Sequence, residues 1–216
     1  MDEYFSLYRG GSGEIEEKKS RFIATLEPAT TEEEAQAFFD RIKKQYWDAK
    51  HNCTAFVIGD QGQIMRSSDD GEPSGTAGRP MLEVLTGEKI TNVAVVVTRY
   101  FGGTLLGTGG LIRAYQGAVK EGLKDCVILK KIKGIELKVI TDYTDSGKLS
   151  YMAASNNWNV MSTEYGQQVT TLILAELAAT DRIITQITDA TSARARVEKG
   201  REVVFARVGD GIEVFE

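Results

Sequence analysis

Residues 93–115 read VAVVVTRYFGGTLLGTGGLIRAY, and this stretch decides the fold of the first half of the chain. The apolar segment that ends at Tyr100 is typical of a central strand, and the segment from Leu111 to about Leu123 is typical of a helix. Five glycines form the connecting loop, namely Gly102, Gly103, Gly107, Gly109 and Gly110. Glycines in such a loop leave backbone N–H groups free to bind an anion at the helix N-terminus. They equally suit a loop that needs positive φ angles or close backbone packing, so both interpretations stay open.

Two arginines and two tyrosines flank this loop. Arg99 lies at the end of the strand and Arg113 near the start of the helix, with Tyr100 and Tyr115 beside them. Arginine next to aromatic rings suits phosphate binding and base stacking, and it also suits a structural ion pair. We expect the arginines to be partly exposed beside one concavity if they bind an anionic partner, and buried against carboxylates if they are structural.

The segment SSDDGEPSGTAG, residues 67–78, is a second loop rich in turn-forming residues. Its carboxylates Asp69, Asp70 and Glu72 are candidate partners for the arginines, or weak magnesium ligands. An Asx-type turn is favoured over a metal site, because no metal-ligand spacing is present. Arg79 follows this loop directly and joins the candidates for partner binding.

Neither loop matches a known nucleotide-binding motif. The dinucleotide pattern GxGxxG would need glycine at residue 112, and the P-loop pattern would need lysine at residue 108. His51 and Cys53 lie two residues apart, too far for a hydrogen-bonded pair on a strand, and no third group orients them. We therefore predict that neither is catalytic, and we predict no metal and no cofactor. General-base chemistry by the carboxylates stays open.

The composition is typical of a folded protein, with 42% hydrophobic and 26% charged residues in a chain of 216. Its 26 basic and 31 acidic residues give a net charge of −5, so RNA binding would need a local basic patch. The longest apolar run, residues 93–97, is far shorter than the roughly 20 residues of a membrane span, which argues against a membrane partner. The N-terminus lacks the features of a signal peptide, so we expect a cytoplasmic location.

The order of expected elements changes after Cys126. Before it we expect strands over 4–29, broken at glycines 10, 11 and 13, a helix with a capping box at Thr31, strands over 53–58, 63–68 and 90–100, and a short helix after Pro80. After it we expect a strand over 134–141, a helix over 147–156, strands over 159–165 and 169–175, a helix over 180–190 and a strand over 202–208. The order β-α-β-β-α-β is that of a ferredoxin-like unit. With a boundary near residues 128–133, the sequence predicts an α+β protein with domains 1–130 and 131–216.

The two loop segments together carry a family resemblance. SSDDGEPSGTAGRPML, followed by VAVVVTRYFGGTLLGTGGLIRAY, closely resembles the signature of the IMPACT family, the group that includes the bacterial YigZ-type proteins. The resemblance covers residues 1–130 directly, and residues 131–216 resemble the small C-terminal domain of the bacterial members.

This resemblance implies a fold for each domain. The N-terminal domain is expected to be similar to the second domain of a small-subunit ribosomal protein and to GHMP-type kinases, in which a glycine-rich loop before a helix binds phosphate. GTGGL at 107–111 is similar in placement but lacks the serine-rich pattern of those kinases, which argues against kinase activity. The C-terminal domain is expected to resemble the ferredoxin-like domains of elongation factor G.

The resemblance also implies a class of function, because eukaryotic family members act in translational control by binding a regulator of a stress kinase. We accordingly expect a non-enzymatic factor linked to translation that binds RNA, the ribosome or a translation-associated protein through the two loops. Two alternatives stay open. One is an enzyme or binder that acts on a phosphorylated small molecule or nucleotide at the glycine-rich loop, and the other is a pure protein-interaction module.

Overall fold

A computed structural model describes residues 2–209 and 211–215 of the chain. The backbone forms two units, the first from Glu3 to Lys130 and the second from Lys131 onward. Each unit combines an antiparallel sheet with helices, so the protein belongs to the α+β class. Among the described residues, no helix is both long enough and apolar enough to cross a membrane.

The first unit is built on a five-stranded antiparallel sheet in the order β2-β3-β7-β4-β5. Its strands are β2 (Gly11–Glu17), β3 (Ser20–Pro28), β4 (His51–Ile58), β5 (Ile64–Ser68) and β7 (Val93–Tyr100). Its helices are α1 (Glu32–Gln45), α2 (Gly78–Gly87) and α3 (Gly107–Leu123). Outside this sheet, β1 (Glu3–Arg9) pairs in parallel with β6 (Ile90–Thr91).

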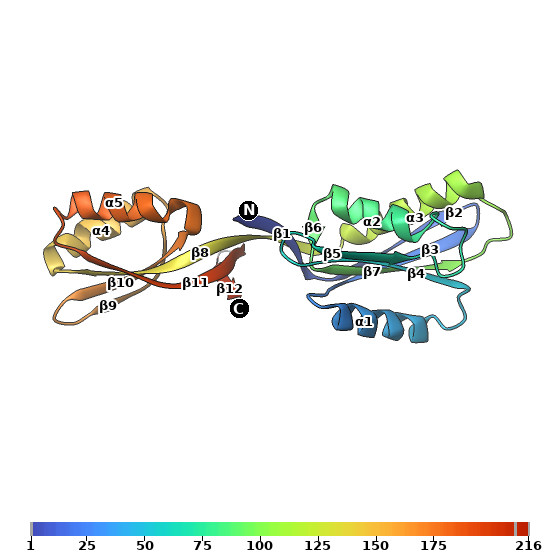
Figure 1. Cartoon of the computed structure of the whole chain (residues 1–216), viewed down its shortest axis with the longest axis horizontal. Helices are drawn as coiled ribbons and strands as arrows, with labels where there is room; N and C mark the ends of the chain where they lie inside the picture. Colours follow the sequence, from blue (N-terminus) through green and yellow to red (C-terminus); the bar gives the residue numbers. More distant parts are fainter. Residues whose placement is uncertain (1, 210, 216) are drawn as a thin grey trace. The chain divides into compact units, whose positions relative to one another are not determined.

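The central strand β7 is buried on both faces, which explains its uninterrupted apolar sequence. Val93, Val95 and Val97 belong to the core that includes α2 and α3, whereas Ala94 and Val96 belong to the core that includes α1. Figure 1 shows α1 on one side of the sheet and α2 and α3 on the other. The alternation of β7 therefore directs its odd-numbered residues toward α2 and α3.

Helix α1 begins as the sequence predicts. Thr31 is its N-cap, and the Thr31 hydroxyl accepts a hydrogen bond from the Glu34 N–H at 3.2 Å. The Glu34 carboxylate accepts from the N–H and the hydroxyl of Thr30, at 2.7 and 2.9 Å. The reciprocal bond of the capping box is thus made one residue before the N-cap.

The second unit has a five-stranded antiparallel sheet in the order β12-β11-β8-β10-β9. Its strands are β8 (Val127–Thr141), β9 (Asn159–Tyr165), β10 (Val169–Glu176), β11 (Arg196–Val208) and β12 (Gly211–Phe215). Helix α4 (Tyr143–Ser155), the 3-10 turn Leu177–Ala179 and helix α5 (Thr180–Ala190) complete it. Leu149, Ile183 and Ile187 of the two helices pack with inward residues of the sheet. From β8 to β11 the element order is the predicted β-α-β-β-α-β.

Of the glycines near the N-terminus that were predicted to break a strand, Gly10 separates β1 from β2, but Gly11 and Gly13 do not form a break. Gly11 and Gly13 lie inside β2, which makes residues 4–29 part of three strands rather than one or two. A Cβ on Gly13 would lie 2.5 Å from the Gly122 backbone nitrogen, so glycine lets β2 approach the end of α3 closely. The predicted strand over 90–100 is also divided, because Asn92 has a φ of 52° between β6 and β7.

Residues 128–133, where the sequence predicts the domain boundary, lie within β8, in which Ile132 pairs with Phe205 and Lys133 with Val204. The low apolar content of this segment is compatible with a strand, because alternate residues of a strand can be polar. The C-terminal hairpin was also missed, since β11 begins at Arg196 and β12 follows it.

Candidate functional site

The two predicted loops meet at a buried group of polar side chains in the first unit. Arg99 follows Val93, Val95 and Val97 on the same face of β7, so it lies under α3 rather than at an exposed strand end. Its Nη1 donates to Oε1 of Glu72 at 2.6 Å, and the two side chains are 7% and 3% exposed. This ion pair joins the loop over residues 67–78 to the end of the central strand.

Helix α3 contributes a third partner to the same carboxylate. The Tyr115 hydroxyl donates to Glu72 Oε1 at 2.8 Å, and Tyr115 is fully buried. The Sγ of Cys53 lies 3.3 Å from that hydroxyl and 3.0 Å from the Asp69 carbonyl oxygen. Residues from β4, the loop over 67–78, β7 and α3 therefore share one hydrogen-bonded network, which we call the buried network (Cys53, Glu72, Arg99 and Tyr115).

Two aromatic rings enclose the guanidinium of Arg99. Its Cζ lies 5.4 Å from the ring centroid of Phe22, its cross-strand neighbour on β3, and 5.7 Å from that of Phe101. Its Nε is buried and has no hydrogen-bond acceptor among the described residues. Arg99 thus holds the Phe101 ring at the start of the glycine-rich loop while its own charge is directed into the protein.

The carboxylates of Asp69 and Asp70 accept hydrogen bonds from the backbone. Asp69 accepts hydrogen bonds from the N–H groups of Gly75, Ala77 and Gly78 at 2.8, 3.0 and 2.8 Å. Burial acts to raise the pKa of Asp69, but these three donors outweigh it and hold the pKa below its usual range. No group of three or more metal-ligating side chains occurs in the part of the chain that the structure describes.

Asp70 and His51 form a second set of contacts at the same edge. Asp70 accepts from the Asn52 N–H at 2.7 Å and pairs with Lys43 at 3.3 Å. Nδ1 of His51 lies 2.8 Å from the Asp70 carbonyl oxygen. Burial raises the pKa of the Cys53 thiol to about 12, so it is not a thiolate at neutral pH. Both side chains thus contact the backbone of the loop over 67–78.

The five glycines that follow β7 fall into two groups, those of the loop and those of helix α3. The loop itself covers residues 101–106, and Gly107, Gly109 and Gly110 belong to the first turn of α3, so the expected helix start at Leu111 was four residues too late. Gly102 is required for close packing, because a Cβ there would lie 2.0 Å from the Lys19 carbonyl carbon. Its N–H donates to Ser20 Oγ at 3.0 Å and is not free to bind an anion. Gly103 is exposed, with a φ of 86°.

The charged and aromatic candidates also separate. Arg113 is exposed and makes no ion pair with any described residue. Arg79 is exposed on α2 and pairs with Glu83 at 3.1 Å. The Tyr100 hydroxyl donates to Asp48 at 2.8 Å. The expectation that Arg99 and Arg113 flank one exposed site thus fails for Arg99, and the buried alternative applies to it.

Strand pairing brings further residues to this loop that the sequence did not indicate. Lys18 and Lys19 form the exposed turn between β2 and β3, and the Lys19 backbone contacts Gly102. Phe101 and Leu105 project from the loop with 53% and 82% of their surface exposed. We call Lys18, Lys19, Phe101, Leu105 and Arg113 the loop surface. No local pattern links residues 18–19 to residues 101–113, because only the sheet makes them neighbours.

Comparison with known proteins identifies a class of protein with this two-part architecture. The model of the Impact N-terminal domain matches residues 18–123, and that of a domain of unknown function, DUF1949, matches residues 139–194. The IMPACT family member YvyE of Bacillus subtilis is 41% identical over 201 residues, which cover 93% of this chain and 92% of that protein. The chain belongs to the IMPACT family.

Further relatives differ in how much of the chain they match. The IMPACT family member YigZ of Escherichia coli is 38% identical over 150 residues, which cover 68% of this chain and 74% of that protein. The Protein IMPACT homolog of Saccharomyces cerevisiae is 37% identical over 101 residues, 44% of this chain and 38% of that protein. The chain is also similar to a protein whose structure is titled a crystal structure of a hypothetical protein. The two sequences are 31% identical, the TM-score is 0.59, and the match covers 91% of this chain and 97% of that chain.

Proposed function

We propose that this protein is a non-enzymatic factor linked to translation, and that its loop surface binds single-stranded RNA, either free or within the ribosome. The observation that carries the proposal is a set of three exposed cations beside an exposed aromatic ring. Lys18, Lys19 and Arg113 make no ion pair with any described residue. Cations without carboxylate partners beside an aromatic ring suit phosphate contacts and base stacking.

Packing of α3 on β2 supports the grouping of these cations. Gly122 lies against Gly13, and Gly117 lies against the Ile15 side chain, so the helix runs in the opposite direction to the strand. Continuing this register directs the first two turns of α3, the second of which carries Arg113, toward the Lys18–Lys19 turn. The positive charges of Lys18, Lys19 and Arg113 thus form a local basic group in a chain whose net charge is −5. Glu17 is the exposed acidic residue next to this turn.

The buried network argues against an enzyme at the same loop. Its carboxylate is satisfied by Arg99 and Tyr115, and its thiol has a raised pKa. A general base must reach a substrate proton, and Glu72 is closed off beneath the loop. These groups fix the loop, and the exposed side chains are the ones that reach a partner.

The test measures binding of a labelled single-stranded RNA 20-mer by fluorescence anisotropy at several salt concentrations. The variants are Arg113→Gln and the double variant Lys18→Gln, Lys19→Gln, and the matched control is Lys120→Gln, near the exposed C-terminal end of the same helix. We expect each lost phosphate contact to lower the slope of log K against log salt by about 0.7 to 1. Glu17→Gln should strengthen binding.

Equal affinity and equal slope for wild type and both loop variants would contradict the proposal. Pull-down from a lysate with and without ribonuclease separates the RNA interpretation from the protein-interaction alternative. Partners that are retained after ribonuclease treatment, and lost on Leu105→Ser, would favour a protein partner. Turnover of a phosphorylated small molecule would favour the enzyme alternative.

The fold of the second unit supports the link to translation. With β8, β9, β10 and β11 numbered one to four, the sheet order is four-one-three-two with all neighbours antiparallel. We infer from this order a ferredoxin-like topology, the fold expected from the resemblance to elongation factor G domains. The likeness of the first unit to ribosomal and GHMP-type domains stays a prediction.

A further inference from the structure

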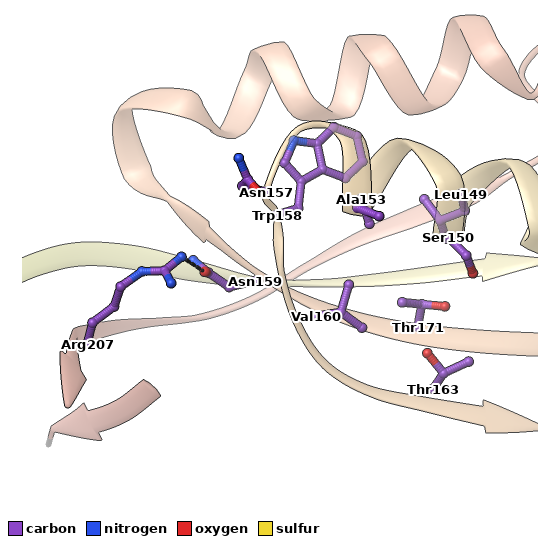
Figure 2. A pocket seen from close by; sticks show the side chains of 11 residues that line it. Leu149, Ser150, Ala153, Asn157, Trp158, Asn159, Val160, Thr163, Thr171 and Arg207 are labelled. Carbon is purple, nitrogen blue, oxygen red and sulfur yellow. Dashed lines mark hydrogen bonds between the residues drawn. The ribbon is translucent and has the colours of Figure 1, made fainter. Parts of the chain in front are cut away.

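The second unit contains a groove that the proposed RNA-binding surface does not use. It lies between helix α4 and the edge strand β9, and its volume is about 470 Å³, which is within the usual range of ligand sites. Leu149, Ala153, Trp158 and Val160 supply apolar lining. Ser150, Thr163 and Thr171 supply hydroxyl groups along the groove (Figure 2).

One charge lines this groove, and it is positive. Arg207 is exposed at one end, where its Nη2 donates to Oδ1 of Asn159 at 3.2 Å. Asn159 is itself held in place, because its Nδ2 donates to the Leu174 carbonyl oxygen at 3.3 Å. Figure 2 shows the Arg207 guanidinium directed toward Asn159. Arg207 has no carboxylate partner among the described residues, so its charge is available to an anionic group.

The second wall of the groove is formed by the edge strand of the sheet. Strand β9 pairs with β10 on one side, so among the described strands alternate N–H and C=O groups on its other side have no strand partner. The strand has neither lysine nor proline, and its one charged residue is the exposed Glu164. A register shift occurs early in the strand, but Ser162–Tyr165 pair regularly with residues 169–172.

Two tyrosines outside the groove lining connect the start of α4 to the end of β9. Tyr143 begins α4 and Tyr165 ends β9, and their rings stack with centroids 6.4 Å apart. The Tyr143 hydroxyl donates to the Gly166 carbonyl oxygen at 2.8 Å, which fixes the helix start against the hairpin turn. The groove itself thus has an apolar middle and a cationic end at Arg207.

We propose that this groove binds the C-terminal segment of a partner protein as an added antiparallel strand on β9, with its terminal carboxylate on Arg207. The strand edge supplies main-chain hydrogen bonds, as in other cases of β-strand addition. The apolar lining accepts the side chain of the last or second-last residue, and the guanidinium binds the carboxylate. A peptide with its C-terminus at Arg207 runs from residue 165 toward residue 159, antiparallel to β9.

The test uses the full chain and two synthetic pools of random hexapeptides. One pool has free C-terminal carboxylates, and the other is identical but amidated at the C-terminus. We expect the full chain to retain members of the free-acid pool and not their amidated forms. Individual retained peptides should bind Arg207→Gln about tenfold more weakly or worse, and should slow hydrogen exchange in residues 160–165.

Two further variants make the result specific to the groove. Ser150→Trp fills it without removing the cation, and should also abolish binding. The matched control is Arg182→Gln, which removes an exposed arginine of α5 outside the groove and should leave affinity unchanged. Far-UV circular dichroism verifies that each variant is folded.

Four results would overturn the proposal. The first is that neither pool is retained above background, and the second is that free-acid and amidated peptides bind equally well. The third is that Arg207→Gln binds the peptides with unchanged affinity. The fourth is that the groove binds an RNA oligonucleotide and no peptide, and that this RNA binding depends on Arg207. None of these variants lies on the loop surface, so failure here is distinguishable from failure of RNA binding there.

Discussion

Removal of the Glu72 carboxylate is expected to destabilise the first unit strongly. The Arg99 side chain is only 7% exposed. In Glu72→Ala its guanidinium keeps its charge but loses its carboxylate partner, and the Tyr115 hydroxyl loses its acceptor. Breaking one side of a buried ion pair costs about 3 to 5 kcal/mol of the free energy of unfolding. Tyr115→Phe removes one hydrogen bond to a charged group and should cost about 1.5 to 3 kcal/mol.

The assay is urea unfolding followed by far-UV circular dichroism, with hydrogen exchange used to assign each transition to a unit. With a slope of about 2 kcal/mol per molar urea, Glu72→Ala should lower the midpoint of the first unit by about 1.5 to 2.5 M. Peptides of the second unit should keep their exchange protection. The matched control is Glu83→Ala, which breaks the exposed pair with Arg79 and should change stability by less than about 1 kcal/mol.

A double variant separates the value of the ion pair from the cost of an unpaired charge. Glu72→Leu with Arg99→Met replaces both charges by apolar groups, so it should be more stable than either single variant. A cost below about 1 kcal/mol for Glu72→Ala would refute the reasoning. So would a double variant whose loss equals the sum of the two single losses.

Three further predictions follow from contacts in both units. Burial raises the pKa of Cys53 to about 12 and of Cys126 to about 11, so a thiolate-selective reagent at pH 8 should label Cys126, which is partly exposed, slowly and Cys53 only after unfolding; fast labelling of native Cys53 would contradict this. Hydrogen bonds from Arg194 and Lys148 lower the pKa of Asp145 relative to the unfolded chain. The stabilisation that these bonds give is therefore present at neutral pH and is lost as the pH falls through the lowered pKa. Asp145→Asn should reduce the melting temperature of the second unit at pH 7 and have little effect at pH 2. Residues 128–133 lie inside β8, so trypsin should cleave them slowly. Brief trypsin treatment should therefore cleave the exposed turn of residues 18–19 before it cleaves within residues 128–133. Earlier cleavage within residues 128–133 would favour a flexible joint.

Much of the fold follows from local sequence patterns. The N-cap at Thr31, the apolar run before Arg99 and the bounds of α5 are all local signals, and the structure contains each of them. The errors share a cause, because they lie where distant segments decide the outcome. Gly11 and Gly13 look like strand breakers until α3 is packed against them.

The candidate site shows the same limit. Periodicity alone would have placed Arg99 on the buried face, since it continues the odd-numbered valines of β7. Its identity as an arginine, beside tyrosines and glycines, favoured an exposed anion site instead. The contribution of Lys18 and Lys19 had no signal in the sequence, because strand pairing alone brings their turn to the glycine-rich loop.

The most distinctive segments of the chain are therefore distinctive for a structural reason. Glu72, Arg99 and Tyr115 come from three separate segments, and each is favourable when buried only if the other two are present. Substitution of one of the three residues therefore leaves a buried partner without its hydrogen bond. Arg113, in contrast, is exposed and forms no ion pair with any described residue. Within the motif of residues 93–115, the side chains that we propose to contact a partner therefore lie on the surface, outside the buried network.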